Sequence, residues 1–448
     1  MARRKTHIPL NVFLNNRLVG RFEKEASGAV WFQYDATWLA LDGPLAISRS
    51  LPLSEKTYRG EVVAAVFENL LPDNDRVRRR VAERTGADGT DAYSLLERIG
   101  RDCVGALQFL PDGVEPETRA EIRGEPVSDA EIERMLANLE NAPLGMDDEH
   151  EFRLSIAGAQ EKTALLYQDG QWMRPLGTTP TTHILKPQIG TIPTSTGEID
   201  LSNSVDNEHY CLKLMEAFGL QVAQTQIATF GKRRVLVVER FDRLRLDDGR
   251  LIRLPQEDCC QALGVPPSRK YQSTVIGGQN GPNAVDILRL LQEGNSPITD
   301  QAAFLKAQIL FWLIGATDGH AKNFSIALRP RGFALTPFYD VLSAQLAVDQ
   351  RQIPRNKFKL AMSVGNSRKY TIWNINGRHF HETAKEAALG RSVVNQVIEE
   401  IRDAVTIAPE LALAAMPDDF ATDIYKSIRA AIDERIVQLG DDSADVLE

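Results

Sequence analysis

The N-terminal part of the chain carries short runs in which apolar and polar side chains alternate. Two of these runs, Asn11–Leu14 and Leu18–Phe22, flank a polar Asn15-Asn16 turn, and a third covers 29–34. Alternation with a period of two, interrupted by turn residues, is typical of antiparallel hairpins. We therefore expect the chain to open with a small β-sheet.

A helical pattern replaces this alternation at Glu61, where apolar residues begin to recur at spacings of three and four. The first helix is expected to stop at Pro72. The next, at 76–84, carries five arginines, which we interpret as a solvated helix face. A helix at 93–99 and a strand at 106–110 are expected to follow. The segment 111–126 is rich in Pro, Gly and Glu, which is typical of a linker.

The middle of the chain has the pattern of a sheet with one inserted helix. Ser128-Asp-Ala-Glu131 has the form of a capping box that starts a short helix. Strands are expected at 152–156, 163–167, 183–185, 226–230 and 235–238, and the inserted helix at 205–218. Beyond Pro255 helices dominate, including those expected at 304–314 and 392–405.

These patterns divide the chain into four parts, and the fold class that we expect is α+β. The parts are an N-terminal subdomain at 1–112, a linker with the capping helix at 113–150, a β-rich lobe at 151–254 and a helical lobe at 255–448.

Composition narrows the class of protein. The 448 residues include 43% hydrophobic and 25% charged side chains, as in ordinary globular proteins. The most apolar run, 309–316, is far shorter than the roughly 20 residues of a membrane span, and the basic N-terminus precedes no apolar signal core. The four cysteines form no CxxC pair, which fits a reducing bacterial cytoplasm. A net charge of −9 excludes a protein that binds nucleic acid with its whole surface.

The most specific chemical signal is Asp318-Gly-His-Ala-Lys-Asn323, which follows an almost wholly apolar helix. Asp and Asn have the spacing of the kinase catalytic loop D-x-x-x-x-N, in which the Asp accepts the substrate hydroxyl proton and the Asn holds a magnesium ion. Asp340 ends a strand-like run, as a second Mg²⁺ ligand should. By itself the hexapeptide is equally compatible with an ordinary helix-ending turn, because Asp, Gly and Asn favour turns.

Candidates for the other parts of a kinase occur in the required order along the chain. The small residues from Ser155 to Lys162 could form a phosphate-binding turn, Lys186 ends an apolar strand, and Glu208 begins a helix from which it could pair with Lys186. Each has an ordinary alternative: a plain turn, an edge lysine before a proline, and a solvated glutamate in a first helical turn. The segment Glu239–Asp242 stands where a kinase has its hinge, so its backbone could bond adenine and Asp242 the ribose.

Three motifs resemble the HipA family of bacterial serine/threonine kinases, which are the toxins of type II toxin-antitoxin systems. The motifs are Ser155-Ile-Ala-Gly-Ala-Gln-Glu-Lys162, Leu254-Pro-Gln-Glu-Asp258, and Gly315–Asn323 together with Leu335–Asp340. The resemblance covers nearly the whole chain. It implies a protein-kinase-like fold with a β-rich N-terminal lobe, a helical C-terminal lobe and an extra β-rich N-terminal subdomain.

The same resemblance implies an enzyme that depends on ATP and Mg²⁺. Asp318 would be the catalytic base, and Asn323 and Asp340 the metal ligands. Ser155 matches the serine that family members autophosphorylate, which inactivates them by ejecting the phosphate loop; the added charge would repel ATP. The ATP-binding residues that the resemblance implies are Ala157, Gly158, Ala159, Gln160, Glu161, Lys162, Lys186, Glu239, Arg240, Phe241, Asp242, His320 and Lys322.

A substrate and two partners are also implied by the resemblance. The substrate would be glutamyl-tRNA synthetase or another aminoacyl-tRNA synthetase, whose phosphorylation on a serine halts translation and yields dormant cells. The partners would be a HipB-type helix-turn-helix antitoxin dimer and, through it, operator DNA, with the toxin acting as co-repressor. The alternatives are a small-molecule or lipid kinase of the same superfamily and a catalytically silent co-repressor.

The segment from Arg351 to His379 is basic in an otherwise acidic protein. It holds seven basic and no acidic side chains, namely Arg351, Arg355, Lys357, Lys359, Arg368, Lys369 and Arg378, whereas residues 401–448 hold four basic and eleven acidic ones. The basic segment is compatible with a patch that contacts DNA phosphates beside the antitoxin. It is equally compatible with a solvated face or with a surface that meets an acidic antitoxin.

Overall fold

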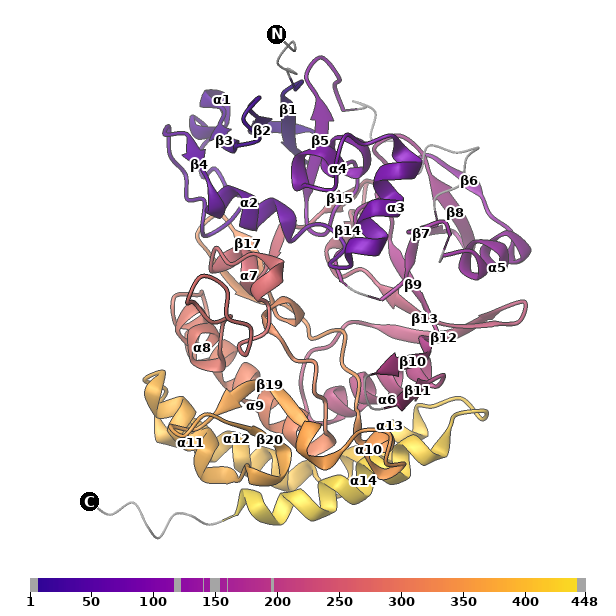
Figure 1. Cartoon of the computed structure of the whole chain (residues 1–448), viewed down its shortest axis with the longest axis vertical. Coiled ribbons are helices and arrows are strands. Elements are labelled where there is room, and N and C mark those ends of the chain that lie inside the picture. Colours follow the sequence, from indigo (N-terminus) through magenta and orange to yellow (C-terminus); the bar gives the residue numbers. More distant parts are fainter. Residues whose placement is uncertain are drawn as a thin grey trace. The chain divides into compact units, whose positions relative to one another are not determined.

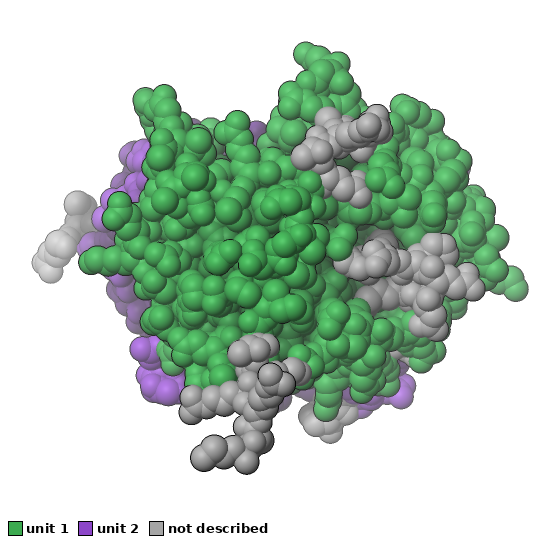
Figure 2. All heavy atoms as spheres, turned by 90° about the horizontal axis from the view of Figure 1, so that it is seen from above, with its two compact units in different colours: residues 1–187, 228–268, 325–333 green, residues 188–227, 269–324, 334–448 purple. Residues whose placement is uncertain are grey.

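The computed structural model describes residues 7–116, 122–139, 141–145, 154–158, 160–194 and 197–440. It divides into two compact units, which are coloured separately in Figure 2. Unit 1 comprises residues 1–187, 228–268 and 325–333, and unit 2 comprises residues 188–227, 269–324 and 334–448. The chain therefore passes repeatedly from one unit to the other. The four-part division drawn along the sequence stays a prediction.

Unit 1 begins with an antiparallel sheet of five strands in the order β4-β3-β2-β1-β5. The strands are β1 (Leu10–Leu14), β2 (Arg17–Lys24), β3 (Val30–Tyr34), β4 (Tyr58–Arg59) and β5 (Leu107–Pro111). Asn15 and Asn16 join β1 to β2 with φ angles of 46° and 67°. This left-handed conformation is the one that a tight hairpin turn requires and that asparagine tolerates. The predicted hairpins are confirmed.

Helices α1 (Ala36–Leu39), α2 (Glu61–Glu68) and α4 (Ala92–Ile99) contact this sheet, and α3 (Asp75–Thr85) packs against α4. Phe22, Phe67 and Phe109 are fully buried and in mutual ring contact at the centre of the core. One expectation for α3 is wrong: Arg78 is buried rather than solvated, because its guanidinium donates to the carbonyl of Pro72 and pairs with Glu68.

The second sheet has the strand order β12-β13-β9-β7-β8-β6. Its strands are β6 (Gly124–Pro126), β7 (Thr163–Gln168), β8 (Gln171–Pro175), β9 (His183–Pro187), β12 (Thr225–Phe230) and β13 (Arg233–Glu239). β6 pairs with β8, so the expected linker at 111–126 ends in an edge strand. Of the strand expected at 152–156, residues 154–156 are described, and Leu154 forms only an isolated bridge to Asp102. Helix α5 (Asp129–Ala137) begins at the predicted Ser128–Glu131 capping box.

The remaining elements of unit 1 are short. They are β14 (Arg243–Arg245), β15 (Leu251–Arg253), β16 (Gln256–Asp258), α7 (Cys259–Ala262) and β17 (Ser325–Arg329). β18 (Gly332–Leu335) pairs with β17 at the point where the chain leaves the unit.

Unit 2 is mainly helical. Its helices are α6 (Ser204–Ala217), α8 (Ala284–Gln292), α9 (Pro297–Ile314), α10 (Gln345–Asp349), α11 (Gly377–Glu386), α12 (Arg391–Ala404), α13 (Ala408–Ala414) and α14 (Thr422–Ile436), and its strand pairs are β10 (Gly190–Thr194) with β11 (Gly197–Leu201) and β19 (Lys359–Val364) with β20 (Lys369–Thr371). The helices predicted at 205–218, 304–314 and 392–405 are confirmed. Within the ranges described, no helix combines the length and the apolar character that crossing a bilayer requires.

Helix α9 is the central element of unit 2. It contacts α8, α12 and α14, which are drawn in salmon (α8), orange (α12) and yellow (α14) in Figure 1. Its last turns are apolar on every side, which is typical of a fully buried helix. It ends at Gly315, whose φ of 72° and close approach to Phe358 exclude a larger residue. The loop that begins with Asp318 therefore leaves a rigid support.

Glu257, in the motif Leu254–Asp258, is a buried acid in unit 1. One of its carboxylate oxygens accepts a hydrogen bond of 2.8 Å from the backbone nitrogen of Arg49. Burial raises the pKa of Glu257 from 4.5 to about 8. The folded state holds this proton more tightly than the unfolded state. Protonated Glu257 therefore makes its full contribution to the free energy of unfolding below the unfolded-state pKa, and this contribution is lost as the pH rises through the folded-state pKa.

We expect Glu257→Gln to remove part of the pH dependence of folding. In the wild type the free energy of unfolding should fall by about a few kcal/mol as the pH rises from about 5 to about 9, and in the variant it should fall less. Urea unfolding followed by tryptophan fluorescence at several pH values measures this slope. Glu83→Gln, at an exposed position of α3, is the control. Equal slopes in the wild type and Glu257→Gln would contradict the prediction.

Candidate active site

The segment Asp318–Asn323 follows α9 in unit 2 and folds back on itself. The side-chain nitrogen of Asn323 donates to the carbonyl of Asp318 at 2.7 Å, and the backbone nitrogen of His320 donates to the same carbonyl at 2.8 Å. Asp318 is exposed, whereas His320, Lys322 and Asn323 are buried. The structure therefore brings the predicted base and one predicted metal ligand together and presents the carboxylate of Asp318 at the surface.

Asp340 is held next to this loop by its neighbours. The hydroxyl of Tyr339 donates to the carbonyl of Lys322 at 2.9 Å, so the residue before Asp340 contacts the residue before Asn323. Asp340 has a φ of 60°, in the left-handed region that favours glycine. A non-glycine residue in this conformation costs roughly 1–3 kcal/mol, and such residues cluster at functional sites.

Two residues that sequence reasoning missed support the same segment. The side chain of Asn207, on α6, donates to the carbonyl of Ser343 at 2.8 Å and accepts from its backbone nitrogen at 2.9 Å. The hydroxyl of Ser343 donates to the carbonyl of Ile314, at the end of α9. An asparagine in the interior of a helix was the signal that could have pointed to this role, since asparagine competes with helical hydrogen bonding.

Lys186 and Glu208 lie in different units, and each is buried. Lys186 is 6% exposed on β9, opposite Leu236 of β13 in unit 1. Glu208 is 2% exposed on α6 in unit 2. The alternatives of a surface lysine and of a solvated glutamate are therefore wrong, and the pairing of the two residues stays a prediction.

The predicted phosphate turn lies in unit 1 and is held in place by hydrogen bonds. Ser155 is fully buried, and its hydroxyl donates to the carbonyl of Leu70 at 2.7 Å. The carbonyl of Gly158 accepts from the backbone nitrogen of Asp73 at 3.1 Å. The ammonium group of Lys162 donates to the carbonyl of Ala157 at 2.6 Å and lies so close to Gly158 that a side chain there would collide with it.

The other residues of this turn are less closely defined. Gln160 donates to the carbonyl of Pro187 at 3.1 Å, which ties the turn to the end of β9. Glu161 is half-buried. Ala159 lies outside the described residues.

The predicted hinge is only partly suited to its role. Glu239, at the end of β13, is the antiparallel strand partner of His183 on β9. The backbone nitrogen of Arg240 donates to the carbonyl of Thr182. The expected contact of Asp242 with ribose is wrong for this structure, because Asp242 is 4% exposed and its carboxylate bonds Arg240 and the backbone nitrogen of Gly105. The side chain of Arg240 is likewise enclosed.

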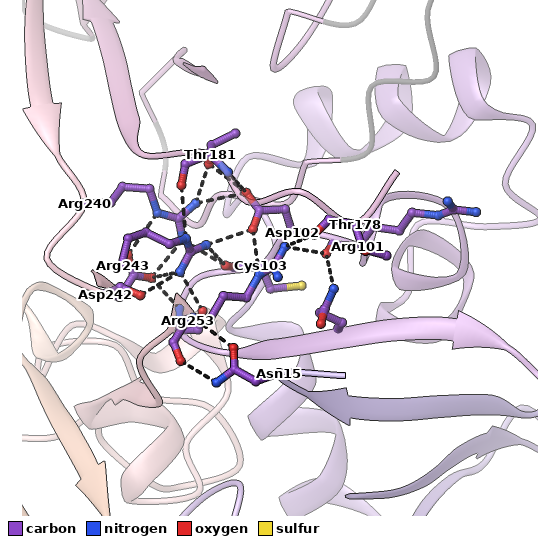
Figure 3. A network of polar contacts seen from close by, with 12 residues as sticks. Asn15, Arg101, Asp102, Cys103, Thr178, Thr181, Arg240, Asp242, Arg243 and Arg253 are labelled. Carbon is purple, nitrogen blue, oxygen red and sulfur yellow. Dashed lines mark hydrogen bonds and ion pairs between the residues drawn. The ribbon is translucent and has the colours of Figure 1, made fainter. Parts of the chain in front are cut away.

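Asp242 belongs to a buried ionic network, shown in Figure 3. The second acid of the network is Asp102, whose carboxylate forms ion pairs with Arg243 at 2.8 Å, with Arg253 at 3.1 Å and with Arg240 at 3.4 Å. Burial opposes the charged form of Asp102, but the three guanidinium groups outweigh it and hold the pKa of Asp102 well below its usual range.

Backbone carbonyls complete the network. Three arginines face two aspartates, and the surplus donors are taken up by the carbonyls of Cys103, Thr178 and Thr181. The hydroxyl of Thr181 donates to Asp102 at 2.7 Å. A buried charge is tolerated only when it is paired and its hydrogen bonds are made, a condition that this arrangement meets.

The seven basic residues between 351 and 379 lie in unit 2. Six of their side chains are exposed, and Lys369 is half-buried. Arg355 lies over the ring of Trp373 at 4.0 Å, and Arg368 pairs with Glu386 at 3.1 Å. The segment is thus a basic surface, with one of its charges offset by an acid.

The architecture of the described residues is of the α+β class, and two family models match the chain. Residues 154–408 match the HipA-like C-terminal domain, and residues 10–110 match the HipA N-terminal domain. The chain belongs to the HipA family.

Relatives span most of the chain. The protein Y4mE of Sinorhizobium fredii (strain NBRC 101917 / NGR234) is 35% identical over 403 residues, or 89% of this chain and 90% of that protein. The serine/threonine-protein kinase toxin HipA of Shewanella oneidensis is 28% identical over 373 residues, or 81% of this chain and 80% of that protein. The word kinase stands in the names of both relatives.

A solved structure shares the fold. It is HipA in a complex with HipB and operator DNA from Shewanella oneidensis MR-1, with a TM-score of 0.78, 23% sequence identity, and coverage of 96% of this chain and 98% of that chain. The predicted fold class and the predicted family are therefore confirmed.

We expect Asp102→Ala to destabilise unit 1 strongly. Removing one partner of a buried ionic group leaves uncompensated charge in the interior, which costs about 3–5 kcal/mol. The measurement is urea unfolding at neutral pH. Asp248→Ala is the matched control, because Asp248 pairs with Arg250 at the surface of the same unit, and this variant should unfold like the wild type. A stability loss that is equally small in both variants would show that the network contributes little.

Proposed function

We propose that this chain is a serine/threonine protein kinase that uses ATP and Mg²⁺ and acts as the toxin of a toxin-antitoxin pair. The observation that carries the proposal is the exposed carboxylate of Asp318, with the amide of Asn323 bonded to its backbone and Asp340 held beside the same loop by Tyr339. A carboxylate in this position can accept the proton of a substrate hydroxyl as the oxygen attacks the transferred phosphate.

The donor atoms of Asn323 and Asp340 fit a magnesium ion. The amide nitrogen of Asn323 is committed to the carbonyl of Asp318, which leaves the amide oxygen as the donor for a hard cation. Among the residues that the structure describes, no group of three or more His, Cys, Asp and Glu side chains could hold an ion by itself. Few protein oxygens suffice for Mg²⁺, because it retains water and binds nucleotide phosphates. When bound, it would offset the charge on the transferred phosphate.

The ATP-binding residues are proposed from the family. Lys186 and Lys162 would contact phosphates with the turn Ala157–Lys162, and the backbone of Glu239–Phe241 would bond adenine. Lys186 is 6% exposed, on strand β9. His320 and Lys322 are assigned to the ATP site because they belong to the loop of Asp318. Asp242 is omitted from the ribose site because the ionic network occupies it.

Ser155 is proposed as a site of autophosphorylation that inactivates the enzyme. In this structure its hydroxyl is fully buried, so phosphorylation requires the turn to leave its place. That movement breaks the hydrogen bond from Ser155 to Leu70 and the one from Asp73 to Gly158. A phosphate adds about two negative charges, which could not return to a buried site and would repel ATP phosphates.

The substrate and the partners are proposed from the family. The substrate is a serine of glutamyl-tRNA synthetase or of another aminoacyl-tRNA synthetase, and its modification would arrest translation and growth. The partners are a HipB-type antitoxin dimer and operator DNA, because the solved relative is a complex with HipB and operator DNA. The exposed basic segment 351–378 offers the positive charge that phosphate contacts need.

We expect Asp318→Asn to abolish phosphate transfer. The wild type, incubated with γ-labelled ATP and Mg²⁺, should label Ser155 and added aminoacyl-tRNA synthetase, and loss of the base should slow both reactions by about 10²–10⁴-fold. Asp423→Asn, an exposed aspartate on α14, is the control and should remain active. Persistent labelling in Asp318→Asn would sink the assignment of the base. Transfer to a free metabolite but to no protein would replace the protein kinase by a small-molecule kinase.

We expect the basic segment to contribute to operator binding. In the complex with antitoxin, the double variant Arg355→Ala and Lys357→Ala should lower the slope of log affinity against log salt by about 0.9 for each lost phosphate contact. Arg76→Ala, at an exposed position of α3, is the control. An unchanged slope would contradict the DNA contact, and an unchanged slope with weaker antitoxin binding would assign the segment to the antitoxin.

A further inference from the structure

Tyr271 lies against the loop that carries Asp318, although 47 residues separate the two in sequence. Its hydroxyl donates a hydrogen bond of 2.6 Å to the Oδ1 atom of the Asp318 carboxylate. We propose that Tyr271 is the positioning residue of the catalytic base, an inference that rests on the proposed kinase function. Sequence reasoning assigned no role to Tyr271.

Two further contacts tie the same dipeptide to the loop. The ring of Tyr271 meets the ring of His320 edge-on, with centroids 4.8 Å apart and an interplanar angle of 81°. The carbonyl of Lys270 accepts from the backbone nitrogen of Ala321 at 3.2 Å. Residues 270 and 271 therefore contact the loop at three successive points, through a hydroxyl, a ring and a backbone carbonyl.

The other side of Tyr271 is anchored by its neighbour. The side chain of Gln272 donates to the hydroxyl of Ser363 at 2.9 Å and accepts from the backbone nitrogen of Ser363 at 2.7 Å. Ser363 belongs to β19, and both it and Gln272 are buried. Tyr271 is thus fixed between β19 and the loop of Asp318, so its hydroxyl cannot easily follow a displaced carboxylate.

The chemistry of the hydrogen bond gives Tyr271 its role. Asp318 is exposed, so its carboxylate would rotate readily without a fixed partner. A phenol that donates to one carboxylate oxygen limits this rotation and holds the other oxygen toward the position of a substrate hydroxyl. Removing the phenol should therefore impair the chemical step, with little effect on nucleotide binding.

The test is the variant Tyr271→Phe, which keeps the ring contact with His320 and removes only the hydroxyl. We expect kcat for phosphate transfer to fall about tenfold, while KM for ATP stays within about twofold. The thermal unfolding midpoint should equal that of the wild type.

The matched control is Tyr425→Phe. Tyr425 donates a hydrogen bond of 2.5 Å to the carboxylate of Glu410, so the same chemical pair is removed from helices α13 and α14. This variant should keep the wild-type kcat and KM. Wild-type kcat in Tyr271→Phe, together with an inactive Asp318→Asn, would overturn the role of Tyr271 alone. Equal activity in the wild type and Asp318→Asn would instead overturn the proposed base. A lowered unfolding midpoint, with kcat and KM for ATP both impaired, would reduce Tyr271 to a structural residue.

Discussion

The buried carboxylate of Asp102 is the constraint on which the arrangement of unit 1 depends. It lies between α4 and β5, whereas the arginines that it pairs with come from the segment after β13. Three guanidinium groups can remain in the interior only if acids and carbonyls satisfy them, because an uncompensated buried charge costs several kcal/mol. The segment 240–253 is therefore confined to one position relative to the first sheet. Strand β13 ends at Glu239, directly before this segment, and we propose that adenine binds at that strand end.

In unit 2 the positions of the candidate residues depend on an apolar helix rather than on a buried ionic network. The support is α9, an apolar helix in contact with other helices, and the loop of Asp318 follows Gly315, which ends that helix. Single polar contacts then place the candidate residues: Tyr339 brings Asp340 to the loop, and Asn207 fixes the segment that follows. Tyr271 extends the same principle to the carboxylate of Asp318. A rigid apolar support with a few directional hydrogen bonds is what the positioning of catalytic groups requires.

Local patterns predicted the elements of this fold well. The Asn15-Asn16 turn, the capping box at Ser128 and the apolar helix before Asp318 each leave a signature within a few residues, and the structure confirms all three. Contacts between distant residues leave no such signature. Asp102 and Arg240 are 138 residues apart, and neither periodicity nor spacing could reveal that they meet.

The candidate site shows the same limit of sequence reasoning. The spacing of Asp318 and Asn323 is a local feature, so it could be recognised, whereas the support from Tyr271, 47 residues away, could not. Asp242 was assigned to ribose because of its place in a kinase-like order of motifs. Its burial between arginines depends on the folded chain, as does the burial of Arg78 in a helix that looked solvated.

We propose that Asn323 and Asp340 hold the metal ion of a phosphate-transfer site served by Asp318. A crystal structure with Mn²⁺ and a non-hydrolysable ATP analogue tests this assignment, because anomalous scattering locates the metal. We predict an ion bound by the side-chain oxygens of Asn323 and Asp340 and by the nucleotide phosphates. An ion bound with the nucleotide elsewhere, touching neither side chain, would contradict the claim.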